Sequence, residues 1–325
     1  VRVSFKDQKV STRADHAGNW RVRLEPIQAD AHPSQMLVAS DGQTLAVDDV
    51  LVGEVWLCSG QSNMEWPVSH SNHAEKEIAS ANWPLIRHIN APQRPSMQPL
   101  DDINAKWELC SPQKVPWFTA VGYYFGRRLH QELDVPIGLL NCTYGGTRIE
   151  PWIPLGGYAK VPELAELYRK IMAKQPDSDA YQAAADTYLD NLNDWIHRSR
   201  QQLDKHQPIE EPTAFPQLLI PYTDRQDPTA LYNGMMRPFI PFTIRGSIWY
   251  QGESNMTEAN TYVEMTRALV LGWREKWERP DLPYYYVQLA PFKYGKESPH
   301  ILASTSTSVK PPTSTRRTSR GSASV

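Results

Sequence analysis

The chain has 325 residues, with 34 basic and 36 acidic side chains, a net charge of −2 and 40% hydrophobic residues. This length suits about two domains. A near-neutral chain without a basic stripe is not expected to bind nucleic acid. No apolar run approaches the roughly 18 residues that a membrane span needs, so no span is expected.

The first 49 residues alternate apolar and polar side chains in three stretches, Val1–Phe5, Trp20–Leu24 and Met36–Ala39. Turn sequences at Gly18-Asn19 and Asp41-Gly42 separate them, and the pattern predicts a small antiparallel β unit. The chain begins with a valine inside a strand-like stretch and shows no secretory signal. We therefore expect a fragment or a mature form, which leaves the localisation unknown.

From residue 50 the pattern changes to strands that alternate with helices, which predicts an α/β domain with a doubly wound parallel sheet. Strand-like runs lie at 50–58, 85–90, 136–142, 244–250 and 283–289, and helical patterns at 121–129, 162–174, 180–205 and 262–277. Because two of these helices follow each other without a strand, residues 155–230 are predicted to be a helical insertion beside the site.

Ser62 lies in the stretch Ser59-Gly60-Gln61-Ser62-Asn63-Met64, directly after the first apolar run. A buried strand followed by a small-residue turn is how many hydrolases present a nucleophilic serine, and a helix N-terminus after it favours developing negative charge. The spacing differs from the Gly-x-Ser-x-Gly elbow. These six residues alone are equally compatible with a polar turn of no catalytic role.

Two further strand-like runs end in small, polar loops that contain glycine, namely 141–152 and 246–255. Sites in open parallel sheets form at the carboxyl ends of strands, where such loops converge. Acyl transfer requires a nucleophile and donors directed at the oxyanion. Ser62, a backbone N–H at Gly145 or Gly146, and the side chain of Asn255 would supply them.

Three segments of the chain together resemble the sequence blocks of SGNH-type esterases. Their exact residues are most similar to those of the sialate O-acetylesterases. The segments are Gly60–Met64, Tyr144–Thr147 and Trp249–Asn255, and the resemblance covers roughly residues 1–300. It implies a flavodoxin-like parallel sheet domain after a small β-sandwich, whose first strands are expected to be missing from this chain. It also implies Ser62 as nucleophile, an oxyanion hole of Gly145 or Gly146 with Asn255, a sugar O-acetyl ester as substrate, and an extracytoplasmic location.

Other polar residues near these blocks are candidates for substrate binding: Gln61, Asn63, Arg148, Asn233 and Glu253. Glu253 has a second reading, in which it orients a histidine, and a third, in which it binds loop amides. Arg148 is expected to pair with Glu150 rather than line the cleft.

Aromatic and histidine side chains near the blocks are weaker candidates. Trp152 and Trp249 are expected in the core rather than on a sugar face. His70 and His73 follow the serine loop but lack a carboxylate partner at suitable spacing.

Metal and cofactor sites are not expected. The cysteines Cys58, Cys110 and Cys142 are too few and too far apart for a zinc cluster and are read as small buried residues. No His, Asp and Glu cluster has ligand spacing, and the resemblance implies no cofactor. The oligomeric state is open.

The last segment, residues 304–325, is rich in Ser and Thr, with four basic and no acidic side chains. Such a composition predicts disorder. SGNH esterases complete their site there with an Asp-x-x-His pair, and sialate O-acetylesterase-like proteins with a segment of the type Asp-Ile-His-Pro-x-Asn-Lys. The chain has neither, and His300 stands outside that context.

The tail has a specific explanation at the level of the gene. Permitted codons for residues 304–325 can be chosen so that the frame starting at the third base of the Ser304 codon reads HIDIGEAADIHPANKPRVGER. This contains the missing segment, so we expect a slip of the reading frame between about Tyr294 and Ser304. The domains are then a partial β-sandwich at 1–49, an esterase domain at 50–303 and a frameshifted tail at 304–325.

The expected function is that of a serine hydrolase removing O-acetyl groups from sialic acid or related sugars, impaired by the loss of the base and its orienting acid. One alternative is deacetylation of a polysaccharide such as acetylxylan. Another is a non-catalytic carbohydrate-binding protein that keeps the cleft. A purely structural module would leave three polar loops unexplained.

Overall fold

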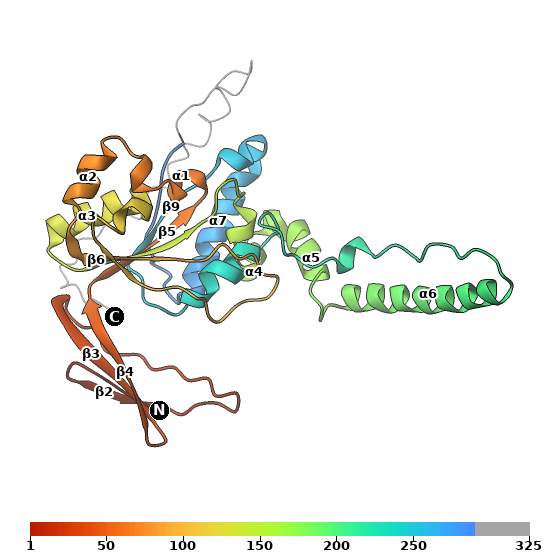
Figure 1. Cartoon of the computed structure of the whole chain (residues 1–325), viewed down its shortest axis with the longest axis horizontal. Helices are drawn as coiled ribbons and strands as arrows, with labels where there is room; N and C mark the ends of the chain where they lie inside the picture. Colours follow the sequence, from red (N-terminus) through yellow and green to blue (C-terminus); the bar gives the residue numbers. More distant parts are fainter. Residues whose placement is uncertain (290–325) are drawn as a thin grey trace, which may run out of the picture.

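The computed structural model describes residues 1–289, and two side chains within that range, at 259 and 260, are left out. A small antiparallel sheet is joined to an α/β body, and a long helical arm projects from the body (Figure 1). The tail at 304–325, its predicted disorder and frameshift, and His300 all lie outside the described residues.

The N-terminal unit is one four-stranded antiparallel sheet in the order β2-β1-β3-β4. Its strands are β1 (Arg2–Phe5), β2 (Gln8–Ser11), β3 (Asp30–Ser40) and β4 (Gln43–Val52). The strand predicted at Trp20–Leu24 is wrong, because this segment pairs with no strand. Ion pairs from Arg21 and Arg23 to Glu278, at 2.9 and 2.7 Å, hold it against the body instead.

The body contains a six-stranded sheet in the order β10-β9-β5-β8-β6-β7, parallel except for the β6–β7 pair. Its strands are β5 (Glu54–Gly60), β6 (Trp83–Asn90), β7 (Glu108–Cys110), β8 (Ile137–Thr143), β9 (Gly246–Tyr250) and β10 (Tyr284–Tyr286). The five strand-like runs are confirmed, the first being divided between β4 and β5. The short edge strand β7 was not predicted.

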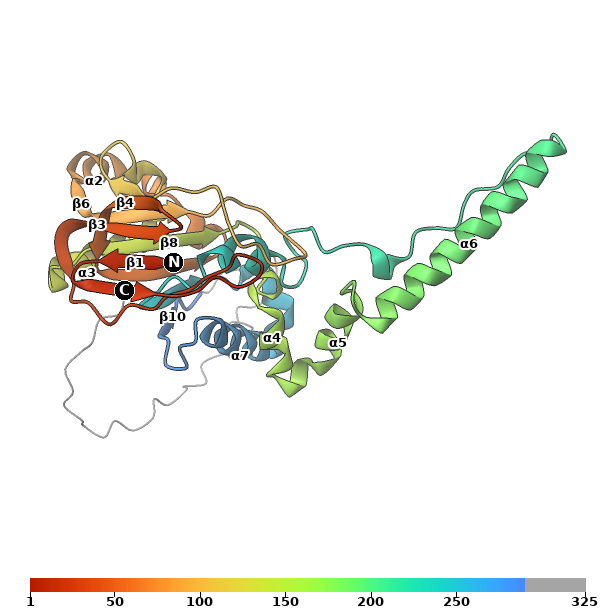
Figure 2. The ribbon, with the colours of Figure 1, turned by 90° about the horizontal axis from the view of Figure 1, so that it is seen from below.

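Both faces of this sheet are buried, as a parallel sheet requires. Along β5, Trp56 and Cys58 belong to one core and Leu57 to the other, as the alternation of side chains dictates. Helices α2 (Ala74–Ser80) and α3 (Ala120–Leu133) cover the first face, and α4 (Leu155–Ala159) and α7 (Ala259–Lys276) the second. Figure 2 shows α2 and α7 on opposite sides of the sheet. The predicted helices at 121–129 and 262–277 are confirmed.

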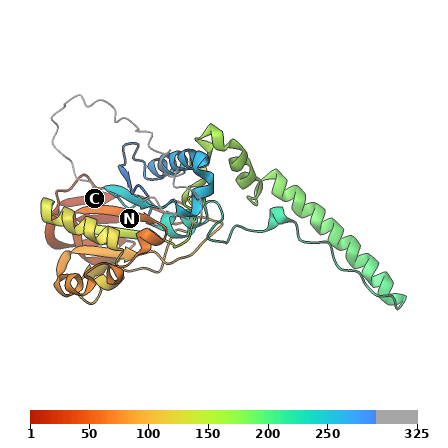
Figure 3. The same cartoon turned by 90° about the horizontal axis from the view of Figure 1, so that it is seen from above.

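The arm is made of α5 (Ala165–Ala173), α6 (Asp179–Asp204) and the segment that returns to the body (Figure 3). Both helices were predicted. Ser178 caps α6 by accepting a hydrogen bond from the Tyr181 N–H at 3.1 Å. Only Ser199 of α6 is buried.

Short helical turns connect these elements. They are α1 (Ser62–Glu65), η1 (Val68–His70), η2 (Val115–Trp117), η3 (Glu150–Trp152), η4 (Pro162–Leu164), η5 (Gln217–Leu219), the π-helical η6 (Tyr232–Met236), η7 (Arg237–Phe239) and η8 (Glu253–Glu258).

The cysteines are free and buried, as predicted. Burial raises the pKa of the Cys110 thiol to about 12. Within residues 1–289 no helix is long and apolar enough to cross a membrane. The same residues contain no group of three or more His, Cys, Asp and Glu side chains arranged to hold a metal ion.

Candidate active site

Three polar loops meet at one edge of the sheet because β5 lies between β8 and β9. The register pairs Gly60, the last residue of β5, with Thr143 on one side and Tyr250 on the other. The loops that follow these three residues are therefore neighbours, although they are far apart in the sequence.

The turn after β5 depends on Gly60, whose φ is +147°. A Cβ atom here would lie 2.1 Å from the carbonyl oxygen of Tyr250, so only glycine fits. The next residue, Gln61, donates its N–H to that same oxygen at 3.0 Å. The turn is thereby tied to the end of β9.

Ser62 is the first residue of α1, and its side chain is exposed. Its hydroxyl forms no hydrogen bond with any residue that the structure describes. Its backbone N–H lies in the first turn of the helix, where such groups have no intrahelical acceptor. The serine is therefore open to a substrate.

Gly145 lies directly beside the serine. A Cβ atom built on Gly145 would be 3.6 Å from the Ser62 Cβ and 2.9 Å from Oε2 of Glu65. That same carboxylate oxygen accepts the Gly145 N–H at 2.5 Å, and the other oxygen accepts from Gln93 Nε2 at 2.7 Å. The Gly145 N–H is thus engaged by a carboxylate.

Gly146 is exposed and has a φ of +70°. Its carbonyl accepts a hydrogen bond of 2.8 Å from Gln226 Nε2, whose Oε1 accepts the Arg148 N–H at 3.0 Å. The Gly146 N–H has no hydrogen-bond acceptor among residues 1–289. Of the two glycine N–H groups, this is the one that is free.

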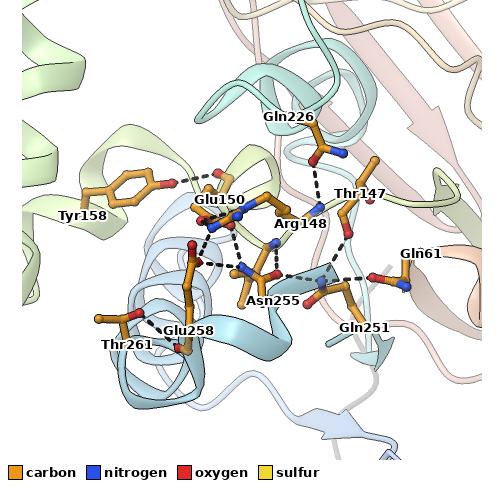
Figure 4. A network of polar contacts seen from close by, with 11 residues as sticks. Gln61, Thr147, Arg148, Glu150, Tyr158, Gln226, Gln251, Asn255, Glu258 and Thr261 are labelled. Atoms are coloured by element: carbon orange, nitrogen blue, oxygen red, sulfur yellow. Dashed lines mark hydrogen bonds and ion pairs between the residues drawn. The ribbon is translucent and has the colours of Figure 1, made fainter. Parts of the chain in front are cut away.

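Asn255 is 3% exposed and lies inside a polar network (Figure 4). Its Oδ1 accepts from Ile149 N–H at 3.0 Å and from Gln251 Nε2 at 2.8 Å. Its Nδ2 donates to Glu150 Oε2 at 3.0 Å. Nδ2 also donates to Glu258 Oε2 at 3.5 Å. The side chain thus connects two loops, and an oxyanion role would require Nδ2 to give up one of its two carboxylate partners.

Arg148 forms ion pairs with two acids, with Glu150 at 2.5 Å and with Glu258 (Figure 4). The pairing expected from the sequence is present, with Glu258 added to it. The hydrogen bonds that Arg148 donates to Glu258 and Glu150 raise the pKa of the arginine, and the same bond from Arg148 lowers the pKa of Glu258. The guanidinium therefore stays charged and fixed.

Gln61 and Asn233 make internal contacts. Gln61 is buried, and its Oε1 accepts from Gln251 Nε2 at 3.1 Å. Asn233 lies in η6 and donates from Nδ2 to the carbonyl oxygen of Met97 at 2.8 Å. These hydrogen bonds connect neighbouring loops of the protein to each other.

Glu253 lies next to the serine turn, because its Oε1 accepts a hydrogen bond from Asn63 Nδ2. Its Oε2 is buried and has no partner among the described residues. Desolvation, followed by the charge of Glu253, raises the pKa of Tyr250. A buried carboxylate oxygen without a hydrogen-bond partner destabilises the fold. Its presence in the structure is explained if this oxygen has a function, such as binding a further group.

The remaining candidates are less connected to the serine. Trp152 and Trp249 are buried in the core, at 0% and 2% exposed, as expected. His70 and His73 are exposed, and neither hydrogen-bonds Ser62. A cavity of about 720 Å³ lies elsewhere, between the N-terminal sheet and the segment 238–244 that precedes β9. It is therefore at the opposite end of the parallel strands from Ser62.

Several residues of the site were missed from the sequence. Gln251 stands inside a quoted block and Glu65 directly follows another, so their position was a signal. Gln93 and Gln226 come from loops without any motif, and only the tertiary structure brings them to the Gly145-Gly146 turn. Glu258 lies three residues after Asn255, one helical turn away.

The fold, with Ser62 after a central strand of a parallel sheet, is similar to that of a carbohydrate acetylesterase of known structure. Residues 52–209 and 223–320 match the family of carbohydrate esterases described as sialic acid-specific acetylesterases, and the chain belongs to this family.

Named relatives agree with this family. The sialate O-acetylesterases of Mus musculus and Homo sapiens are 28% and 27% identical, over 88% and 84% of this chain. The chain spans about half the length of these relatives, 52% and 45%. The crystal structure of a carbohydrate acetylesterase from Xanthomonas citri is 32% identical, with a TM-score of 0.69, covering 93% of this chain and 57% of that one.

Proposed function

We propose that this site belongs to a serine esterase that removes O-acetyl groups from sialic acid or a related sugar. The observation that carries the proposal is the position of Ser62. It is exposed, at the carboxyl end of the central strand, with the backbone of Gly145 beside it. The family match and the similarity to sialate O-acetylesterases support the sugar acetyl ester as substrate.

In the proposed reaction Ser62 Oγ attacks the acetyl carbonyl carbon and loses its proton to a base. The bond between this carbon and the sugar oxygen breaks, and the sugar leaves with a proton. Water then attacks the acetyl-enzyme and releases acetate. The oxyanion would lie between the N–H groups of Ser62 and Gly146, since Glu65 already binds the Gly145 N–H. Asn255 would join them only after a change of its hydrogen bonds.

Glu253 is proposed as the residue that orients the base. Its Oε2 is buried without a described partner, and Asn63 connects it to the serine turn. An imidazole N–H would satisfy that oxygen. Because the histidine and aspartate expected near the C-terminus are absent from the sequence as written, this chain is proposed to be nearly inactive and poorly folded.

The first test is the nucleotide sequence from the Tyr294 codon to beyond the present stop. One gained or lost base there, restoring Asp-Ile-His-Pro in frame, is the expected result. If the frame is confirmed as written, hydrolysis by this chain is abandoned, and the binding of an acetylated sugar without turnover becomes the leading function.

The second test uses the frame-restored chain with O-acetylated sialic acid and with acetylxylan fragments, measuring released acetate. We expect turnover, and a loss of several orders of magnitude in kcat for Ser62→Ala. Faster turnover of acetylxylan would assign the polysaccharide reaction instead. Full activity in Ser62→Ala would remove the serine mechanism altogether.

The division of the chain is proposed as follows: a partial β-sandwich at 1–49, an esterase domain at 50–303 and a helical insertion at about 155–230. Limited proteolysis followed by mass spectrometry tests it. Early cleavage is expected near residue 50 and within the arm, and protection throughout these regions would contradict it.

A further inference from the structure

The arm contains a long helix, α6, that is largely exposed. Helix α6 has 26 residues, which at 1.5 Å each is about 39 Å. It extends away from the body (Figures 1 and 3), and only Ser199 is buried. A helix of this length with one buried residue gains little stability from packing against the rest of its own chain.

One side of α6 is covered by the returning segment. Trp195 Nε1 donates a hydrogen bond of 2.8 Å to the carbonyl oxygen of Glu210. The rings of Tyr188 and Phe215 pack edge to face, with their centroids 5.2 Å apart. These two contacts cover Tyr188 and Trp195, which lie seven residues apart on the same side of the helix.

Beside that covered line runs an apolar stripe whose middle residue is half-buried and whose two end residues are exposed. At 3.6 residues per turn it contains Leu189, Ile196 and Leu203, each seven residues after the last. Leu189 and Leu203 are 53% and 59% exposed. A line of apolar side chains with this spacing supplies one of the two apolar positions of a heptad, through which a second helix can pack.

The polar line that flanks the stripe has the same spacing and reads Asp186, Asn193, Arg200. It is negative at one end, neutral in the middle and positive at the other. Neither charged residue forms an ion pair within residues 1–289. In an antiparallel pair of identical helices centred near Asn193, each Asp186 faces the Arg200 of the second copy.

Two of the three residues of the apolar stripe fit nearly the same centre. Leu189 and Ile196 lie at equal distances in sequence from a point between residues 192 and 193, so each leucine meets the isoleucine of the other helix. A two-fold interface requires this reciprocity, in which residue i contacts j and j contacts i. The charged line is therefore centred on Asn193, the pair Leu189 and Ile196 fits that axis to within half a residue, and Leu203 lies outside this apolar contact.

We propose that α6 is a self-association surface, on which two copies of this chain pair their α6 helices antiparallel about a two-fold axis near Asn193. The proposal is independent of the esterase function. The contact area of one helix pair is small, so a reversible dimer is expected.

Sedimentation equilibrium of the frame-restored chain and of its variants, over a range of concentrations, tests this directly. We expect a monomer–dimer equilibrium, weakened about tenfold or more by Asp186→Arg or by Arg200→Asp, since each change places like charges together twice. The matched control is Asp194→Arg, which reverses an acid on the opposite side of α6 from the stripe and is expected to leave the dimer unchanged.

Complementary charges give the decisive measurement. Mixing Asp186→Arg with Arg200→Asp restores opposite charges at both contacts, so the mixture should dimerise although each variant alone does not. A wild-type chain that stays monomeric at every concentration would overturn the proposal. So would a mixture that associates no better than its components, or a control that dissociates like the two single variants.

Discussion

The N–H of Gly145 donates a hydrogen bond of 2.5 Å to Oε2 of Glu65, and this bond joins the serine turn to the loop after β8. Gln93 holds the other oxygen of the same carboxylate. Glu65 follows Ser62 by three residues, so the first turn of one short helix carries the exposed serine and fixes the glycine beside it.

The first prediction concerns Glu65. In the frame-restored chain, Glu65→Ala should lower kcat about tenfold with little change in KM, because a charge-assisted hydrogen bond that positions the glycine turn is lost. Initial rates over a range of substrate concentrations give both constants. Glu65→Gln keeps an acceptor for the Gly145 N–H and should recover most of kcat. Equal losses in both variants would contradict the positioning role.

The second prediction separates stability from catalysis at Asn255. Asn255→Ala leaves the Ile149 N–H and one Glu150 oxygen without partners. We expect the free energy of unfolding to fall by about 2–3 kcal/mol, measured by urea denaturation of the frame-restored chain. Asn191→Ala, on an exposed part of α6, is the control and should change it by less than about 0.5 kcal/mol. A loss of kcat at unchanged stability would instead support an oxyanion role.

The third prediction concerns Gly60, where two effects act together. Gly60→Ala adds a Cβ 2.1 Å from the Tyr250 carbonyl oxygen at a positive φ, and should cost at least about 3 kcal/mol of unfolding free energy. Gly42→Ala has positive φ in open space and isolates the backbone strain, at about 1 kcal/mol. Similar costs at both positions, again by urea denaturation, would show that the steric contact is relieved by local movement.

The sequence was informative where a residue's role depends on its own strand and loop. The parallel strands and the convergence of three polar loops at Ser62 were predicted from apolar runs that end in glycine-containing loops. The same reasoning gave a wrong strand at Trp20–Leu24. Alternating apolar and polar side chains indicate that one face of a segment is buried, but they do not show that another strand is available to pair with it. The free Gly146 N–H and the occupied Gly145 N–H depend on Glu65, Gln93 and Gln226, which only the three-dimensional arrangement brings together.

The fourth prediction is a dependence on pH. Arg148 lowers the pKa of Glu258, so this carboxylate stabilises the fold above its unfolded pKa of about 4.3 and ceases to do so as the pH falls through its lower folded value. Glu258→Gln should lower Tm by about 1–3 °C at pH 7. The difference from the parent chain should shrink towards zero below about pH 4.

The control for this titration is Glu132→Gln, which removes the partner of Arg128 from a well-exposed pair on α3. Its Tm should follow that of the parent at every pH. A gap between Glu258→Gln and the parent that persists undiminished at pH 3 would show that the contact does not depend on the charge of Glu258.

The position of β5 between β8 and β9 also determines when the site can form during synthesis. Parallel pairing of β5 with β9 joins Gly60 to Tyr250, so most of the polypeptide must leave the ribosome before the serine turn has both neighbours. Contacts of such high sequence separation form slowly, and until then the strand is an unpaired apolar edge. The nascent chain should therefore depend on chaperones over the whole interval in which the arm is being translated.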